Sequence, residues 1–172
     1  MDKYFRQIIL FISVIIVQVI VFNNISVSGY INTYIYILFI ILLPLNTAPW
    51  LQVFSSFAIG LTLDILSGTI GMHAAACTAT GFIRPFLINT LISKDAEPGA
   101  IPGVYFRGLG WFVTYSSILI LIHHMIYFII EKGGFIQFGS TFLKILASSF
   151  FSLTLIVMLA ILISNKRDRA KY

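Results

Sequence analysis

Long apolar runs, several of them about as long as a membrane is thick, leave this chain few ways to fold. Of its 172 residues, 59% are hydrophobic and 10% are charged, and the mean hydropathy is +0.98. An average soluble domain has about 25% charged residues, and a soluble fold of this size cannot bury so much apolar surface in one core. We therefore predict an integral membrane protein with a single domain over residues 1–172.

Six segments are apolar enough for helices that span a bilayer, which takes roughly 20 residues. We predict an all-α protein whose transmembrane helices cover residues 7–22, 30–45, 50–67, 72–92, 109–130 and 140–164. The basic start at Lys3 and Arg6, followed by an apolar run, is also compatible with a cleavable signal peptide. Because another apolar segment follows almost at once, we expect the first helix to be retained.

The basic residues predict how the protein is oriented. An even number of spans places both termini on one side, together with the loop that holds Lys94 and Arg107. The opposite loops hold only Lys132, with Lys144 just inside the last span. Since Lys and Arg accumulate in cytoplasmic loops, both termini are expected in the cytoplasm. The net charge of +5 thus reflects topology, and binding to nucleic acid is not expected.

Small and polar residues recur every four positions on two of the predicted spans. They are Ser56, Gly60, Asp64 and Gly68 on the third span, and Ser140, Lys144, Ser148 and Ser152 on the sixth. This spacing puts each set on one face of a helix, and a face of small residues lets a second helix approach closely in lipid. We therefore expect Asp64 to face protein, where a hydrogen-bond donor reduces the cost of burying the acid.

The residues after Asp64 predict a tight helical hairpin. In the stretch 67–71, Gly68 and Gly71 can supply the positive φ angles that such a turn needs. The next helix starts at once, so His73 is expected to lie near Asp64.

The remaining polar residues of the spans do not predict a reaction centre. Arg84 is about 20 Å down the fourth span at 1.5 Å per residue, so we expect it to anchor the structure, at the interface or on a free carbonyl group, rather than to pair with Asp64. At least one of His123 and His124 is expected to point inward, but a metal site needs more ligands at matched spacing. Cys77 is the single cysteine, and neither GxSxG nor HExxH occurs. We predict no catalytic, metal-binding or cofactor-binding residues.

The hairpin resembles the signature of the MreD family, the rod-shape-determining membrane proteins of bacteria. The shared pattern is a glycine, an aspartate four positions later, a Ser-Gly pair and a glycine that opens the next helix, here Gly60, Asp64, Ser67, Gly68 and Gly71. Gln18, the LLPL stretch at 42–45 and the GFIRPFL stretch at 81–87 are also similar to the family. The turn before Gly71 is about a residue shorter than in some relatives.

This resemblance implies both a fold and a role. The family has six helices, similar to the substrate-binding subunits of energy-coupling-factor transporters. Its members are non-enzymatic scaffolds of the bacterial cytoplasmic (inner) membrane, in the complex that makes lateral peptidoglycan and maintains rod shape. The implied partners are an MreC-type protein, the actin-like MreB, a RodA-type glycosyltransferase and a class B penicillin-binding transpeptidase. The candidate structural or partner-contact residues are Gly60, Asp64, Ser67, Gly68, Gly71, His73 and Arg84.

Two other functions stay open at this point. A small-molecule-binding membrane subunit of a transporter would need several polar groups at one level of the membrane and a separate energising partner. Asp64, His73 and a histidine of the fifth span could form such a site. An intramembrane enzyme would lose its activity, but not its folded state, when Asp64 or His124 is replaced.

Overall fold

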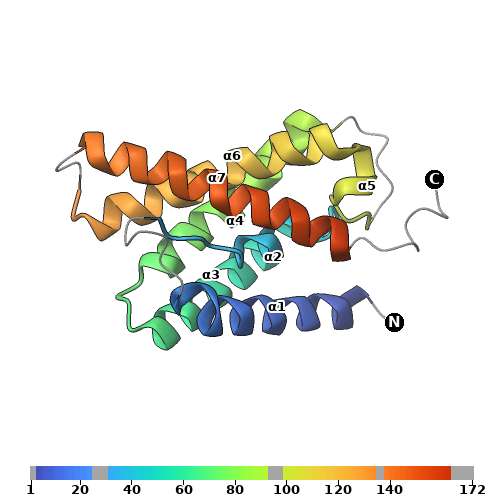
Figure 1. The fold of residues 1–172 in the computed structure, drawn as a ribbon. Coiled ribbons are helices and arrows are strands. Elements are labelled where there is room, and N and C mark those ends of the chain that lie inside the picture. The colour runs from blue at the N-terminus through green and yellow to red at the C-terminus, as the bar shows by residue number, and fades with distance from the viewer. Residues whose placement is uncertain (1–2, 25–30, 93–98, 135–137, 164–172) are drawn as a thin grey trace.

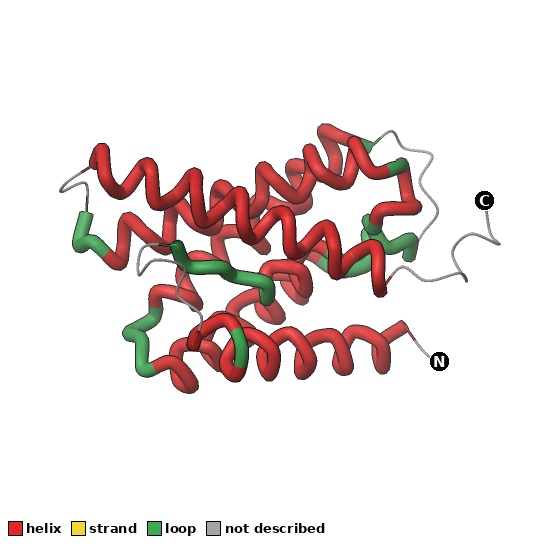
Figure 2. The backbone as a smooth tube through the Cα atoms, in the orientation of Figure 1, coloured by secondary structure: helices red, strands yellow, loops and turns green. Residues whose placement is uncertain are grey.

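The computed structural model is a bundle of long helices (Figure 1), and it describes residues 3–24, 31–92, 99–134 and 138–163. The long helices are α1 (Lys3–Ile20), α3 (Pro49–Ser67), α4 (Met72–Leu91), α6 (Leu109–Glu131) and α7 (Phe138–Ile163). The short ones are η1 (Phe22–Asn24), α2 (Ile37–Ile41) and α5 (Val104–Arg107). Figure 2 shows that turns and loops, without strands, make up the rest of the described chain, which agrees with the predicted all-α fold.

The chain is a membrane protein by the length and character of its helices. Among the described residues, four helical segments are long and apolar enough to cross a membrane: Phe5–Asn24, Pro49–Ser67, Leu109–Glu131 and Gly139–Ile163. Their outward faces carry large apolar side chains such as Phe54 and Phe150, which are 63% and 67% exposed. Apolar surface on this scale is what lipid covers. Helix α4 is as long but more polar, and it packs against α3 and α6.

Five of the six predicted spans coincide with the long helices. The largest difference lies in α1, which begins at Lys3 rather than at residue 7. The prediction of a helix over residues 30–45 is wrong. In that segment only the five residues of α2 are helical, and residues 32–35 before it have no regular secondary structure.

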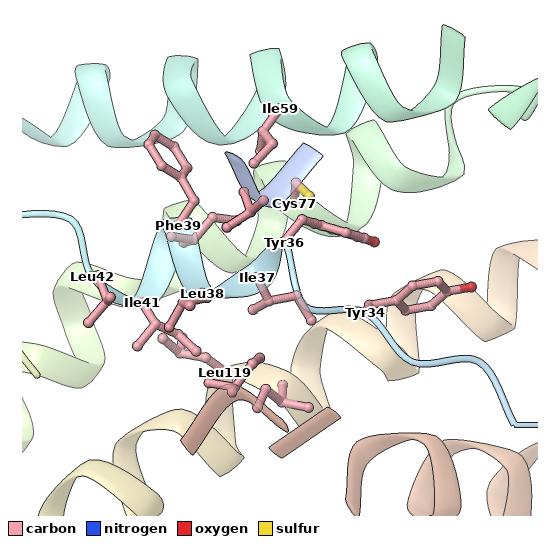
Figure 3. Packing of buried hydrophobic residues seen from close by; sticks show 14 of the residues in the cluster. Tyr34, Tyr36, Ile37, Leu38, Phe39, Ile41, Leu42, Ile59, Cys77 and Leu119 are labelled. Carbon is pink, nitrogen blue, oxygen red and sulfur yellow. The ribbon is translucent and has the colours of Figure 1, made fainter. Parts of the chain in front are cut away.

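Helix α2 lies in the centre of the bundle rather than against lipid. All five of its residues are buried, and Figure 3 shows Ile37, Leu38 and Ile41 packed among side chains that include Ile59 and Leu119. A short apolar run has the same hydropathy whether it faces lipid or fills a protein core, so periodicity alone does not separate the two.

Side chains of the surrounding helices bond the irregular backbone before α2. The N–H of Tyr34 donates to Ser152 Oγ over 2.9 Å, and the N–H of Ile35 donates to Gln18 Oε1 over 2.9 Å. Gln18 also donates from Nε2 to the carbonyl oxygen of Thr33, over 3.1 Å. Non-helical backbone is tolerated at membrane depth only where protein covers it and satisfies its polar groups.

The segment still runs the length of the bundle, antiparallel to α1. It begins beside Gln18, near the end of α1, and Leu42 near its other end accepts a hydrogen bond from Gln7 Nε2 over 3.1 Å. As a result, the start of α1 and the end of α7 lie at the same end of the bundle (Figure 1).

We expect Gln18→Leu to lower the free energy of unfolding by about 2–4 kcal/mol. The change leaves the Ile35 N–H and the Thr33 carbonyl without these partners, and each buried unsatisfied group costs about 1–3 kcal/mol. Equilibrium unfolding in mixed micelles measures the effect. The control is Ile16→Leu on the outer face of α1, where the side chain is 50% exposed. Equal stability of the two variants would contradict the bonding role of Gln18.

Candidate functional site

Helices α3 and α4 pack backbone against backbone. A Cβ atom added at Gly60 would lie 2.5 Å from the carbonyl oxygen of His73 and 2.6 Å from Cα of Ala74. One added at Gly81 would collide with the side chain of Ser56. The small-residue face predicted for the third span is therefore the contact face of this hairpin, because a larger side chain would separate the helices.

The turn between the two helices depends on its glycines. Gly68 ends α3 with φ of 67°, and Gly71 precedes α4 with φ of 71°. These are left-handed conformations, which glycine adopts without a steric cost. Ser67 accepts a hydrogen bond from Asn23 Nδ2 over 2.9 Å, which ties the end of α3 to η1.

The Asp64 carboxylate caps the start of α4 from the neighbouring helix. Its Oδ1 accepts the backbone N–H of His73 over 3.1 Å, and its Oδ2 accepts that of Ala74 over 2.8 Å. The hydroxyl of Thr69 also donates to Oδ1. The first N–H groups of a helix have no partner within it and carry partial positive charge. Asp64 and His73 thus meet as predicted, but through the backbone of His73 and not through its ring.

The imidazole of His73 belongs to a different, buried group of side chains. Tyr36 OH lies 2.7 Å from His73 Nδ1 and 3.0 Å from His123 Nε2, so it bridges the two histidines. Cys77 Sγ lies 3.8 Å from the same nitrogen of His123. Figure 3 shows the hydroxyl groups of Tyr34 and Tyr36 directed away from the apolar packing around α2.

A separate chain of hydrogen bonds holds His124. The Tyr34 N–H donates to Ser152 Oγ, which lies 3.2 Å from His124 Nε2, and His124 Nδ1 lies 2.9 Å from the carbonyl oxygen of Ile120. A carbonyl can only accept, so the proton is on Nδ1 and Nε2 accepts from the Ser152 hydroxyl. Both histidines of α6 are therefore inside the bundle.

Arg84 lies apart from Asp64, as expected, and anchors the other end of the buried segment. The fully buried guanidinium donates from Nε to Tyr115 OH over 2.9 Å and from Nη1 to Gln52 Oε1 over 2.6 Å. Its Nη2 donates to the carbonyl oxygen of Leu43. This carbonyl belongs to the irregular chain after α2 and not to α4 itself, and the buried arginine does not reach the interface. Only the planar fork of arginine reaches all three acceptors.

Six of the seven candidate residues come together in the α3–α4 hairpin, and Arg84 lies farther along α4, about two turns before its end. Sequence reasoning missed Tyr34 and Tyr36. Both lie in the apolar run predicted as a spanning helix, and no local pattern distinguishes them from its other residues. In the described part of the chain, no three His, Cys, Asp or Glu side chains are placed to hold a metal ion.

Comparison of the chain with models of protein families, with curated protein sequences and with solved structures gives no match.

We expect Gly60→Ala to lower the free energy of unfolding by about 1–3 kcal/mol, the usual cost of overpacking a close contact. Gly110→Ala is the matched control, because a Cβ at this helical position meets no atom within 4 Å. That variant should be unchanged, or more stable by up to about 1 kcal/mol. Thermal and denaturant unfolding of both proteins measure the difference. A Gly60→Ala protein as stable as the control would show that α3 and α4 are not in backbone contact.

Arg84→Lys should destabilise the protein by about 2–3 kcal/mol although the positive charge is kept. A lysine ammonium cannot bond Tyr115, Gln52 and Leu43 in the geometry of the guanidinium fork, and hydrogen bonds to charged groups contribute about 1.5–3 kcal/mol each. The same change at the exposed Arg107 serves as the control and should have little effect. Chemical unfolding in detergent compares the two, and equal losses would disprove the special role of Arg84.

Proposed function

We propose that this protein is a non-enzymatic membrane scaffold of the bacterial cell-wall elongation complex. In this role it supports lateral peptidoglycan synthesis and rod shape. The proposal includes the bacterial cytoplasmic membrane as location, with both termini in the cytoplasm. It also includes a fold related to the substrate-binding subunits of energy-coupling-factor transporters.

One observation carries the proposal. The residues that resemble the MreD family, Gly60, Asp64, Gly68 and Gly71, all serve one close-packed hairpin. Both oxygens of the Asp64 carboxylate are bonded within that hairpin. A shared motif whose atoms are used in folding supports a protein that acts by its shape and its contacts.

The proposed partners are an MreC-type protein, MreB, a RodA-type glycosyltransferase and a class B penicillin-binding transpeptidase. The turn at 68–71, which joins α3 to α4, is short. The described long helices carry apolar side chains such as Ile12 and Phe150 on their outer faces. We propose that the membrane-spanning partners contact these helix faces.

Depletion of the protein in its own rod-shaped host tests the proposed function. We expect the cells to round and swell, and to recover their shape when the protein is expressed again. Imaging of cell width during depletion is the measurement. An unchanged shape together with a new nutrient requirement would contradict the scaffold and favour a transport subunit.

In the same host, Asp64→Ala should fail to restore rod shape. The variant leaves the first N–H groups of α4 and the Thr69 hydroxyl without their acceptor, so we expect reduced accumulation of the protein or loss of partner binding. Immunoblots and partner co-purification distinguish these two results. The control is Ile65→Val, at a side chain 73% exposed on the same helix. Normal protein levels and unaltered partner binding of the Asp64→Ala variant would contradict this prediction.

A further inference from the structure

A polar cleft of about 520 Å³ lies at the end of the bundle where α1 ends and the α3–α4 hairpin turns. Its volume is in the range of small-molecule sites, about 300–1,000 Å³. Residues from several separate elements line it, among them Asn24, Asn32, Thr33, Tyr34, His73 and Tyr127. The cleft is thus formed by the tertiary structure and belongs to no single helix end.

Three aromatic rings form the inner wall of this cleft. The ring centroids of Tyr34 and Tyr127 are 4.8 Å apart, and those of His73 and Tyr127 are 4.7 Å apart. Tyr34 and His73 also touch edge to face, at 5.4 Å. The three side chains are nearly buried and pack on one another, so they give the cleft a pre-formed wall made of ring edges.

The hydrogen bonds behind this wall fix the proton on His73. Nδ1 of His123 is buried without a partner, and an orphaned buried N–H is rarer than an orphaned acceptor. We therefore place the His123 proton on Nε2, which donates to the oxygen of Tyr36. Tyr36 then donates its hydroxyl proton to His73 Nδ1. This leaves the His73 proton on Nε2, the ring nitrogen that can serve the cleft as a fixed donor.

The lining selects against charged ligands. None of the described residues that line the cleft is Lys, Arg, Asp or Glu. Asp64 lies behind Thr69, and its carboxylate already accepts three hydrogen bonds. A charged ligand would lose its hydration here and find no opposite charge, at a large cost in free energy. Amide, hydroxyl and imidazole groups instead suit a neutral ligand that both donates and accepts.

We propose that this cleft binds a small uncharged sugar, a mono- or disaccharide. The sugar lies against the outer edges of Tyr34 and Tyr127, and its hydroxyl groups bond Asn32, Thr33, the hydroxyl of Tyr127 and the N–H of His73. The inference goes beyond the proposed scaffold function and does not depend on it, since a scaffold needs no ligand. Cell shape and sugar binding are measured separately, so either proposal can fail alone.

The test uses the full-length protein in lipid nanodiscs, because detergents with sugar headgroups would compete for the site. The probes are N-acetylglucosamine and maltose, with glucuronate as the charged comparison. Isothermal titration and saturation-transfer NMR measure binding. We expect saturable binding of at least one neutral sugar and at least tenfold weaker binding of glucuronate. No saturable binding of either neutral sugar, or equal binding of glucuronate, would overturn the proposal.

Two variants locate the binding. Asn32→Leu keeps the branched shape of the side chain and removes the amide, so it should weaken binding about tenfold, as the loss of one well-placed hydrogen bond does. Tyr127→Phe keeps the ring and removes only the hydroxyl. It is a second variant for the same binding measurement if Asn32→Leu folds poorly. The control is Asn89→Leu, the same change at an exposed residue near the other end of α4. Unaltered affinity in both cleft variants would place binding elsewhere and refute the assignment.

Discussion

A buried backbone that is not helical needs a hydrogen-bond partner for each polar group, and this requirement organises the whole bundle. Residues 31–45 run through the centre of an apolar protein with only one short helix. Their partners come from four surrounding helices, as side chains of Gln7 and Gln18 on α1, Arg84 on α4, Tyr115 on α6, and Ser148 and Ser152 on α7. The polar residues of this apolar sequence therefore lie where they form hydrogen bonds to the non-helical backbone.

Two charged side chains of opposite sign, Asp64 and Arg84, fix helix α4 in the bundle. At its start the Asp64 carboxylate accepts the free N–H groups, where the helix dipole is positive. About two turns before its end, Arg84 donates to a carbonyl of the central segment. A helix with this many polar atoms is costly in lipid, and α4 instead lies between α3 and α6. The Gly60 contact allows α3 to cover it closely.

Much of this architecture could be predicted from the sequence. The parts that could not be predicted have one cause in common. Hydropathy locates the long helices, and the four-residue spacing through Gly60 and Asp64 locates the hairpin and its contact face. The same hydropathy gave the wrong structure for residues 30–45, because it measures which solvent a segment prefers and not how its backbone is bonded. The partners of Gln18 depend on distances across the bundle that no local pattern encodes.

Polar residues whose donors and acceptors are all bonded within the protein serve the fold. A residue with an unused donor or acceptor at a cleft can also bind a ligand. Asp64 and Arg84 have their polar atoms bonded within the protein, and His124 uses both ring nitrogens. His73 differs, because Tyr36 occupies only one of its nitrogens and the ring borders an open cleft. Burying a histidine inside a membrane protein costs free energy unless its ring nitrogens form hydrogen bonds to the protein or to a ligand. The end of the bundle that holds His73 is thus where this fold can recognise a ligand without losing a contact that holds it together.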